Sequence, residues 1–152
     1  SESIGFQIGP RLNAAGRLDT AEISLNLLRT TSATEAAKLA SILEELNKKR
    51  RTNQRAATKE IAERMKNQKE ITPVIIETGN WHEGILGIVA GRLVEKYQKP
   101  AFVLSEVEEG IFKGSGRSFG EFNLAEALEY VKDTIEGGGG HAAAAGVGCG
   151  VS

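Results

Sequence analysis

The segment from Ala33 to Lys66 constrains the fold of this 152-residue chain more than any other feature, because it contains neither glycine nor proline. Most of its residues are strong helix formers, and Ser32 and Glu35 at its start match the pattern of a helix-capping box. A helix through the whole segment would be about 50 Å long, which exceeds the width of a small domain. The sequence therefore predicts a long helix that no single small domain can cover.

The apolar residues of this segment predict that its two ends are buried separately. They recur at helical spacing in 36–46 and again in 57–65, whereas 47–55 is polar on every face and contains five basic residues and no acidic one. We therefore interpret the helix as a strut that packs against one body at each end. The basic residues of its middle fit a solvated face with pairs such as Glu44 with Lys48, which we favour, or contacts to a phosphate backbone.

The sequence before the strut gives a weaker signal. Residues 1–19 show neither a helical nor a strand period, so we expect an irregular segment or a broken helical turn. Asp19 and Glu22 match a second capping box and predict a short helix. Its apolar residues are expected to share one face: Ile23, Leu27 and Leu28.

After residue 70 the pattern changes to short apolar runs that alternate with helical segments. The expected strands are 72–78, 101–105, 111–118 and a final strand from 147. The expected helices are 85–97 and 123–135, the second capped by Asn123 with Leu124, Leu128 and Val131 inward. The predicted fold class is thus α/β, with a long connecting helix followed by a small α/β domain that contains a mixed sheet.

Four consecutive glycines, 137–140, precede His141 and the four alanines 142–145. Glycine loses the most backbone entropy on ordering, and alanine is the residue that most favours a helix. A glycine loop that runs into a helix start exposes unpaired N–H groups at the positive end of a helix dipole, which is an anion site. We therefore predict a phosphate-binding loop here rather than a flexible linker, with a short helix after it. His141 at the junction could add a donor or a proton.

Ser115 and Arg117 lie two residues apart on an expected strand, so their side chains point to the same face. A guanidinium can bind a phosphate through two parallel hydrogen bonds, and the hydroxyl can donate to another oxygen. Gly114 and Gly116 are expected to clear side chains from the backbone for a ligand. A polar surface strand would look similar, but together with the glycine run the pair predicts a two-element anion pocket.

Composition limits the classes of function. Net charge is −1, so any contact to nucleic acid must come from local clusters rather than from a basic surface. No apolar run approaches the length of a membrane span, and no signal peptide is visible. The single cysteine, Cys149, predicts a reducing cytoplasm and argues against a metal–thiolate site. The start at Ser1 and the end at Ser152 suggest a segment cut from a longer protein.

Four motifs in this order resemble the carboxyl-terminal core of the 5′→3′ single-strand-specific DNA exonucleases of the DHH phosphoesterase superfamily. They are Pro10-Arg11-Leu12-Asn13-Ala14-Ala15-Gly16-Arg17-Leu18, the stretch from Trp81-His82-Glu83-Gly84 to Arg92-Leu93, Gly114-Ser115-Gly116-Arg117-Ser118, and Gly138-Gly139-Gly140-His141-x-x-Ala144-Ala145-Gly146. The last two are shared across DHH-associated domains, whereas the first two are more specific to these exonucleases.

The resemblance implies a function and a set of site residues. It implies that single-stranded DNA passes between a DHH domain and a DHH-associated domain, and that Ser115 and Arg117 hold its 5′ phosphate. It places the loop of Gly138, Gly139, Gly140 and His141 beside the scissile bond, with His141 as the candidate catalytic residue. Two further arginines are expected along the strand path: Arg17 and Arg92.

The resemblance also implies a division of the chain and a cofactor. It assigns 1–19 to the end of a DHH domain, 20–70 to a helical connector and 71–152 to a truncated DHH-associated domain. Two Mn²⁺ or Mg²⁺ ions are expected on the DHH domain. The Asp-His-His motif is absent and the chain has only two histidines, His82 and His141, so we expect this chain to bind no metal and to be inactive alone.

Trp81 and His82 precede an expected helix, and we favour a structural role in which they cap it and contact the strut; Trp81 could instead stack a base. Two other functions share the glycine–His and Ser-x-Arg-Ser motifs. One is a phosphodiesterase for short oligonucleotides or small nucleotides, and the other is a tRNA-binding appendage like that of alanyl-tRNA synthetase. The Trp81-His82 motif and the strut argue against the first, and the segment 10–18 argues against the second.

Overall fold

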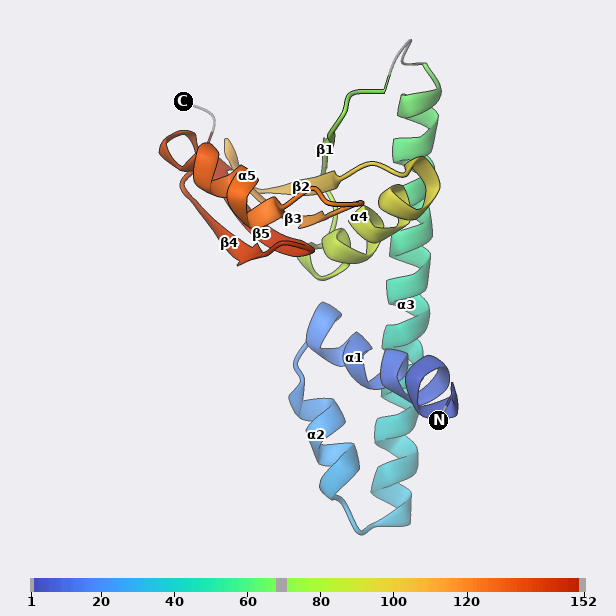
Figure 1. Ribbon diagram of the computed structural model, residues 1–152. Coiled ribbons are helices and arrows are strands. Elements are labelled where there is room, and N and C mark those ends of the chain that lie inside the picture. The colour runs from blue at the N-terminus through green and yellow to red at the C-terminus, as the bar shows by residue number, and fades with distance from the viewer. Residues whose placement is uncertain (1, 68–70, 151–152) are drawn as a thin grey trace. The chain divides into compact units, whose positions relative to one another are not determined.

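The computed structural model describes residues 2–67 and 71–150 (Figure 1). The helices are η1 (Ile4–Ile8), α1 (Gly9–Leu18), α2 (Glu22–Arg29), α3 (Ala33–Lys66), α4 (Glu83–Tyr97), α5 (Leu124–Tyr130) and η2 (Lys132–Thr134). The strands are β1 (Ile75–Gly79), β2 (Ala101–Glu108), β3 (Ile111–Arg117), β4 (Gly137–His141) and β5 (Ala144–Gly150). They form two compact units, Ser1–Asn53 and Gln54–Ser152, and α3 contributes to both.

The first unit begins with helix, so the expectation of an irregular segment over 1–19 is wrong. A π-helical stretch, η1, continues directly into α1. Pro10 does not break the helix; it lies in the first turn of α1, directly after the π-helical stretch, in which the Gly9 N–H donates to the Ile4 carbonyl. Ala14 and Ala15 of α1 are fully buried, so packing of small residues, and not a wide apolar stripe, holds this helix in place.

The two predicted capping boxes have different outcomes. Ser32 caps α3 as expected, because its hydroxyl accepts the Glu35 N–H at 3.3 Å, whereas the Glu35 carboxylate accepts from Thr30. The capping box predicted at Asp19 does not form. Helix α2 begins only at Glu22, whose N–H donates to Thr20 Oγ1 at 3.3 Å. Of the three apolar residues expected on one face of α2, Leu28 is 69% exposed.

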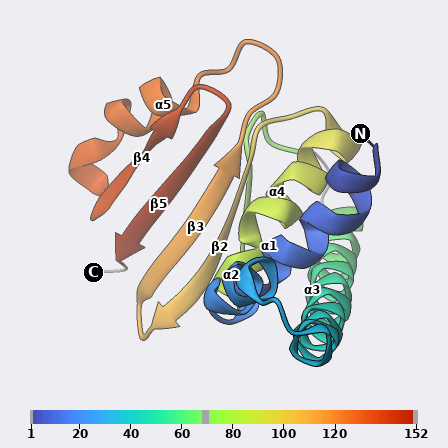
Figure 2. The ribbon, with the colours of Figure 1, turned by 90° about the horizontal axis from the view of Figure 1, so that it is seen from below.

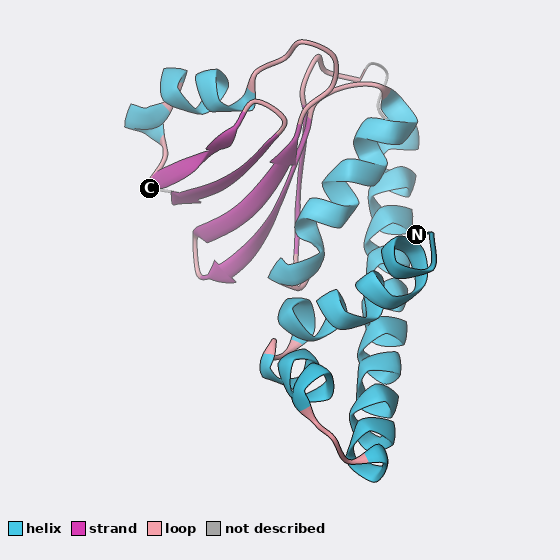
Figure 3. Cartoon of the chain, turned by 60° about the horizontal axis from the view of Figure 1, so that its bottom comes forward, coloured by secondary structure: helices cyan, strands magenta, loops and turns pink. Residues whose placement is uncertain are grey.

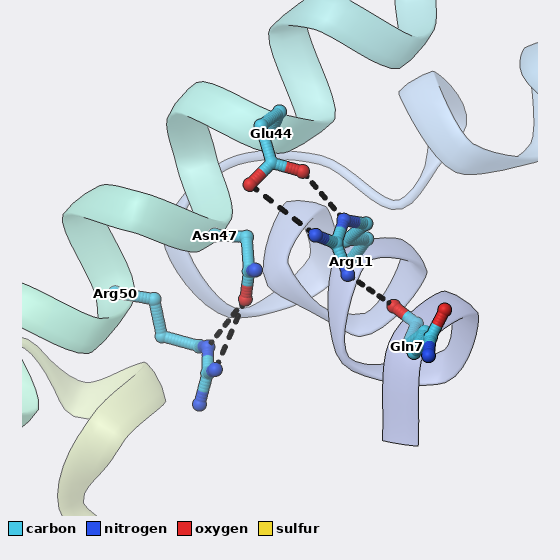
Figure 4. Close-up of polar contacts among 5 residues, drawn as sticks. All are labelled: Gln7, Arg11, Glu44, Asn47 and Arg50. Atoms are coloured by element: carbon cyan, nitrogen blue, oxygen red, sulfur yellow. Dashed lines mark hydrogen bonds and ion pairs between the residues drawn. The ribbon is translucent and has the colours of Figure 1, made fainter. Parts of the chain in front are cut away.

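The predicted helix over Ala33–Lys66 is confirmed, and residues of both expected apolar stripes are buried: Leu43, Ala57, Ile61 and Met65. We had expected the polar middle of the helix to be solvated on every face, but part of it is buried. Asn47 is only 4% exposed, and its side-chain oxygen accepts from Nε and Nη2 of Arg50 at 3.3 and 3.0 Å (Figure 4). Glu44 accepts from Arg11 of α1 at 2.5 Å, where Lys48 was the expected partner.

The second unit contains a five-stranded mixed sheet in the order β1-β2-β3-β5-β4. Only β1 and β2 are parallel, joined through α4, and the other neighbours are antiparallel. The predicted fold class, a long helix followed by a small α/β domain with a mixed sheet, is confirmed. Strand β1 starts at Ile75, later than expected, and its residues alternate between buried and exposed because successive side chains point to opposite faces and only one face is covered.

Helices α4 and α5 cover opposite faces of this sheet (Figure 2). On the α5 face, Phe102 and Leu104 of β2 pack with the buried α5 residues Leu124 and Leu128. This face explains two glycines of β3: a Cβ on Gly114 would lie 2.6 Å from Leu104, and one on Gly116 would lie 2.5 Å from Phe102. The expectation that these glycines make room for a ligand is therefore wrong, because they make room for the core.

The segment after α5 differs most from the sequence-based expectation. Asn123 caps α5 as expected, accepting from the N–H groups of Ala125 and Glu126, but the helix ends at Tyr130 and Val131 is exposed. The glycine run is strand β4, and the alanines begin strand β5, so the two form a hairpin where a loop and helix were expected (Figure 3). An unpaired sheet edge at β3 outweighs the helix propensity of four alanines, because pairing there supplies a ladder of backbone hydrogen bonds.

Candidate functional site

The candidate site lies on the α4 face of the sheet, where side chains of β3 meet a surface without side chains. Ser115 pairs with Gly146 of β5, which pairs in turn with Gly139 of β4. Arg117 likewise pairs with Ala144, which pairs with His141. Residues that pair directly across antiparallel strands share a face, so the predicted phosphate-binding residues Ser115, Arg117, Gly139 and His141 are brought together on one surface.

Ser115 and Arg117 interact with each other beneath α4. Nη1 of Arg117 donates to Ser115 Oγ at 3.0 Å and to the carbonyl of Gly116 at 2.7 Å. Gly87 of α4 leaves the space that they occupy, since a Cβ there would lie 2.6 Å from Arg117 Nη2 and 2.9 Å from Ser115 Oγ. The pair is half-buried. Helix α4 therefore fixes the position of the guanidinium on the sheet, which reduces the entropy lost when it binds an anion.

The four glycines of β4 divide between the two faces. A Cβ on Gly137 or Gly139 would meet nothing within 4 Å, so both leave the α4 face open. A Cβ on Gly138 would contact Leu128 and Ile135 on the α5 face. Gly140 has φ of +155°, and a Cβ there would lie 2.3 Å from the Ala144 carbonyl oxygen. Gly138 and Gly140 are thus required for packing and hairpin geometry, which the sequence did not distinguish from ligand binding.

The hairpin removes the helix N-terminus on which the anion site was predicted. The donors must come instead from the strand, because β4 is an edge strand and alternate N–H groups of an edge strand point away from its partner. His141 is exposed, and its Nδ1 accepts the Ala143 N–H at 3.3 Å. In the neutral ring this leaves Nε2 as the hydrogen-bond donor.

Lys113 belongs to the same surface, and the sequence reasoning missed it. It is exposed, pairs with Gly148, and shares the face of Ser115 and Arg117 because the three alternate along β3. A hollow of about 550 Å³ beside it is lined by Lys113, Gly137, Gly139, Gly146 and Gly148, among others, and by two carboxylates, Glu83 and Glu136. The i, i+2, i+4 spacing of polar residues could have identified Lys113.

The two arginines expected along the strand path lie in different units. Arg92 is on α4 in the second unit, pairs with Glu95 at 2.7 Å, and lines a hollow with Arg55 and Lys59 of α3. Arg17 is on α1 in the first unit. Burial lowers the pKa of Arg50, and the neighbouring positive charges of Arg17 and Arg51 lower it further. Three guanidiniums therefore concentrate positive charge in the first unit, which is the electrostatic condition for an anion contact.

Trp81 and His82 have the structural role that we favoured. His82 Nδ1 accepts the Gly84 N–H at 3.1 Å and caps α4. The Trp81 indole N–H donates to Glu60 of α3 at 3.0 Å, and Arg64 of α3 lies 5.3 Å from the centre of its ring. Because Arg64 occupies a face of the indole, Trp81 is a poorer candidate for base stacking than the sequence alone suggested.

Arg64 also contacts a buried carboxylate. Its Nη1 donates to the Thr78 carbonyl at 2.8 Å and lies 3.6 Å from Oε2 of Glu77, which is 7% exposed. Burial raises the pKa of Glu77; the positive charge of Arg64 opposes this shift and the negative charge of Glu60 adds to it. These contacts fix the end of α3 to β1, so Glu77 serves the packing of the second unit.

Within residues 2–67 and 71–150, no three His, Cys, Asp or Glu side chains come close enough to hold a metal ion. We therefore assign no metal ligand among the described residues and derive no chemical step through a metal. No helix in the described part of the chain is long and apolar enough to cross a membrane.

Comparison with known proteins identifies the class of this domain. Residues 67–150 match the DHHA1 domain family, and the chain belongs to that family. The match covers α4, α5 and the whole sheet, which together contain Ser115, Arg117, the glycine strand and His141.

Individual relatives give a narrower likeness. The single-stranded-DNA-specific exonuclease RecJ of Bacillus subtilis is 40% identical over 148 residues, which are 96% of this chain and 19% of that protein. The crystal structure of RecJ from Thermus thermophilus in complex with Mg²⁺ superposes with a TM-score of 0.85 at 35% identity, over 95% of this chain and 22% of that one. A structure of exonuclease RecJ bound to manganese superposes with a TM-score of 0.82 at 35% identity, over 95% of this chain and 36% of that one. The chain thus spans only a small part of the proteins that it matches.

Proposed function

We propose that this chain is the substrate-binding part of a 5′→3′ exonuclease specific for single-stranded DNA. The observation that carries the proposal is the register of Ser115 and Arg117, through β5, with Gly139 and His141 of β4, on a face that Gly137 and Gly139 leave open. A pre-positioned guanidinium beside a surface without side chains suits the close approach of a phosphodiester backbone. The likeness to RecJ, whose name states this activity, supports the choice of substrate.

The proposal includes a division of labour with the rest of the protein. Residues 1–19 would end a DHH domain, 20–70 would connect it, and 71–152 would form the DHH-associated domain. The DHH domain would bind Mn²⁺ or Mg²⁺, in agreement with the metal-bound RecJ structures. When bound, such a metal pair activates water and stabilises the leaving oxygen. The residues of this chain would hold the strand in place for that step.

Each proposed contact has a defined role. Arg117 binds phosphate oxygens through its guanidinium, and Ser115 donates its hydroxyl to another oxygen of the 5′ phosphate. In the strand segment Gly138, Gly139 and Gly140, the N–H groups that point away from β5 donate to the next phosphate, and Gly139 lets the phosphate approach because it places no side chain on that face. His141 donates from Nε2 toward the scissile region, while Arg17 and Arg92 neutralise phosphates further along the strand.

The decisive experiment is Arg117→Ala in the full-length protein. Loss of a charge-assisted contact of about 1.5–3 kcal/mol lowers kcat/KM on a 5′-phosphorylated oligodeoxynucleotide by roughly 10- to 100-fold. Metal binding, followed by calorimetry, stays unchanged. Arg117→Lys is the matched control: it keeps the charge but loses the two-bond geometry, so its kcat/KM falls between those of the parent and Arg117→Ala. An unchanged kcat/KM in Arg117→Ala would disprove the assignment.

A second measurement concerns the 152-residue chain itself. We expect it to bind 5′-phosphorylated single-stranded DNA weakly, with an affinity that falls as salt rises, because phosphates dominate the contacts. We expect no cleavage after addition of Mn²⁺. Cleavage above background by this chain would contradict the division of labour, and tighter binding to tRNA or to dinucleotides than to DNA would favour the two alternative functions.

A further inference from the structure

The loop between β3 and α5 exposes two aromatic rings beside the candidate site. Phe119 is 43% exposed and Phe122 is 37% exposed, and neither belongs to the buried cluster beneath α5. An aromatic side chain that stays in water gives up the stabilisation that its burial would supply. The two rings lie within four residues of each other, and the first follows Arg117 by two positions.

The loop is held in place at both of its ends. The Ser118 N–H donates to the Ala143 carbonyl at 3.0 Å, and the Leu124 N–H donates to the Ala142 carbonyl at 3.1 Å. Inside the loop, the Ser118 hydroxyl donates to the Phe122 carbonyl. Both anchors lie on the turn between β4 and β5, so the backbone that carries the rings is attached to the turn that follows His141.

The anchors place the rings at the end of the sheet where Arg117 and His141 also lie. Arg117 is the last residue of β3 and His141 is the last residue of β4, and both pair with Ala144. Figure 2 shows the loop after β3 at the same end of the sheet as the β4–β5 turn. A strand whose phosphate contacts Arg117 would therefore bring its nearest bases to this loop.

We propose that Phe119 and Phe122 form a stacking platform for nucleobases of a single strand; this inference rests on the proposed function. Every base has an aromatic face, so stacking binds single strands with little regard to sequence. Inside a duplex, both faces of each paired base are covered by the neighbouring pairs, so only the pair at the very end could stack here without being flipped out. The platform therefore contributes to the selection of single strands, which phosphate contacts alone cannot achieve.

Trp81 does not compete for this role, because Arg64 already lies over its ring. Tyr130 supplies the matched control. It is 91% exposed at the end of α5, in the same unit, and it is not part of the loop. Removing its ring changes the exposed aromatic content of the unit without touching the proposed platform.

The test measures binding of a 5′-phosphorylated oligodeoxythymidylate to the 152-residue chain at fixed low salt. Phe119→Ala and Phe122→Ala each weaken binding about 5- to 100-fold, the range found for base–aromatic stacking, whereas Tyr130→Ala binds as the parent does. Phe119→Leu, which keeps an apolar side chain, weakens binding as well, so loss of the ring is separated from loss of folding. Wild-type affinity for Phe119→Ala and Phe122→Ala, or a loss at only one position, would overturn the platform.

An oligonucleotide with abasic sites at its 5′ end separates this inference from the proposed function. The parent chain binds it as weakly as Phe119→Ala binds the complete oligonucleotide, and Phe119→Ala causes no further loss. Arg117→Ala weakens binding of both oligonucleotides. If Arg117→Ala weakens both and the phenylalanine variants weaken neither, the platform fails and the phosphate site stands; if Arg117→Ala weakens neither, the proposed function fails.

Discussion

Strands β3 and β4 contribute to the candidate site in opposite ways. β3 provides side chains, with Ser115 and Arg117 half-buried under α4 and Lys113 exposed beyond them. β4 provides a surface from which side chains are absent, since Gly137 and Gly139 meet nothing on that face. The two strands should therefore respond to opposite kinds of substitution. Removing side-chain atoms from β3 should impair the site, whereas adding a side chain to β4 should impair it. The difference predicts which substitutions separate binding from folding.

The largest effect on folding is expected at Gly140. Gly140→Ala places a Cβ 2.3 Å from the Ala144 carbonyl oxygen at a φ that L-residues rarely adopt, so the backbone must move. We expect the free energy of unfolding to fall by about 1–3 kcal/mol, measured by urea denaturation.

Gly139→Ala is the matched control for Gly140→Ala, one residue away on the open face. Its Cβ meets nothing within 4 Å, so its stability should stay within about 1 kcal/mol of the parent. Equal losses of stability in the two variants would show that the two faces of β4 are not distinguished as the structure indicates.

The next largest effect is expected at Gly87, where a substitution should weaken DNA binding without destabilising the fold. Gly87→Ala places a Cβ against the flexible end of Arg117 and against Ser115, which displaces the pair, while alanine gains about 1 kcal/mol of helix propensity. We expect DNA affinity to fall several-fold while the midpoint of unfolding stays the same or rises.

Gly91→Ala on the same helix supplies the comparison for Gly87→Ala, because its Cβ meets nothing within 4 Å. It should gain stability and keep its affinity. If Gly87→Ala keeps full affinity as well, the Ser115–Arg117 pair does not depend on α4 for its position.

The smallest expected effect is a pH dependence of stability at Glu77, which lies outside the candidate site. Because burial raises the pKa of Glu77 in the folded state, the native protein holds that proton more tightly than the unfolded chain does. Its contribution to stability is therefore present at low pH and is lost as pH rises from the usual glutamate pKa, about 4.3, through the raised folded value. Thermal unfolding midpoints of the parent and Glu77→Gln should be compared from acidic to neutral pH. The midpoint of the parent should fall relative to that of Glu77→Gln as pH rises. A constant difference would contradict this.

The elements that were predicted correctly carry a strong local signal. The helix over Ala33–Lys66 follows from a long run of helix formers with a Ser32 cap, and β3 follows from its composition and alternation. Residue spacing also placed Ser115 and Arg117 on one face, which their common contact with Gly87 confirms. Such features depend on residues near one another in sequence, so they could be predicted without the rest of the fold.

The errors occur where a distant partner decides the conformation. Two of the four alanines after His141, Ala144 and Ala145, form a strand because β3 offers them an edge. The middle of α3 is partly buried at Asn47, and Glu44 nearby accepts from Arg11 of α1. The glycines of β3 looked like part of a ligand site but make room for Phe102 and Leu104. None of these partners is adjacent in sequence.

The sequence by itself determined the class of fold, the long helix and the residue types of the candidate site. Only the tertiary structure decided which glycines face the candidate site, that the glycine run is an edge strand and not a loop before a helix, and that the segment with Phe119 and Phe122 is bonded to the turn after His141. The physical reason is that local propensity fixes backbone conformation only where no stronger pairing competes. The faces of a sheet are assigned by register, and register is set by contacts between strands far apart in the chain.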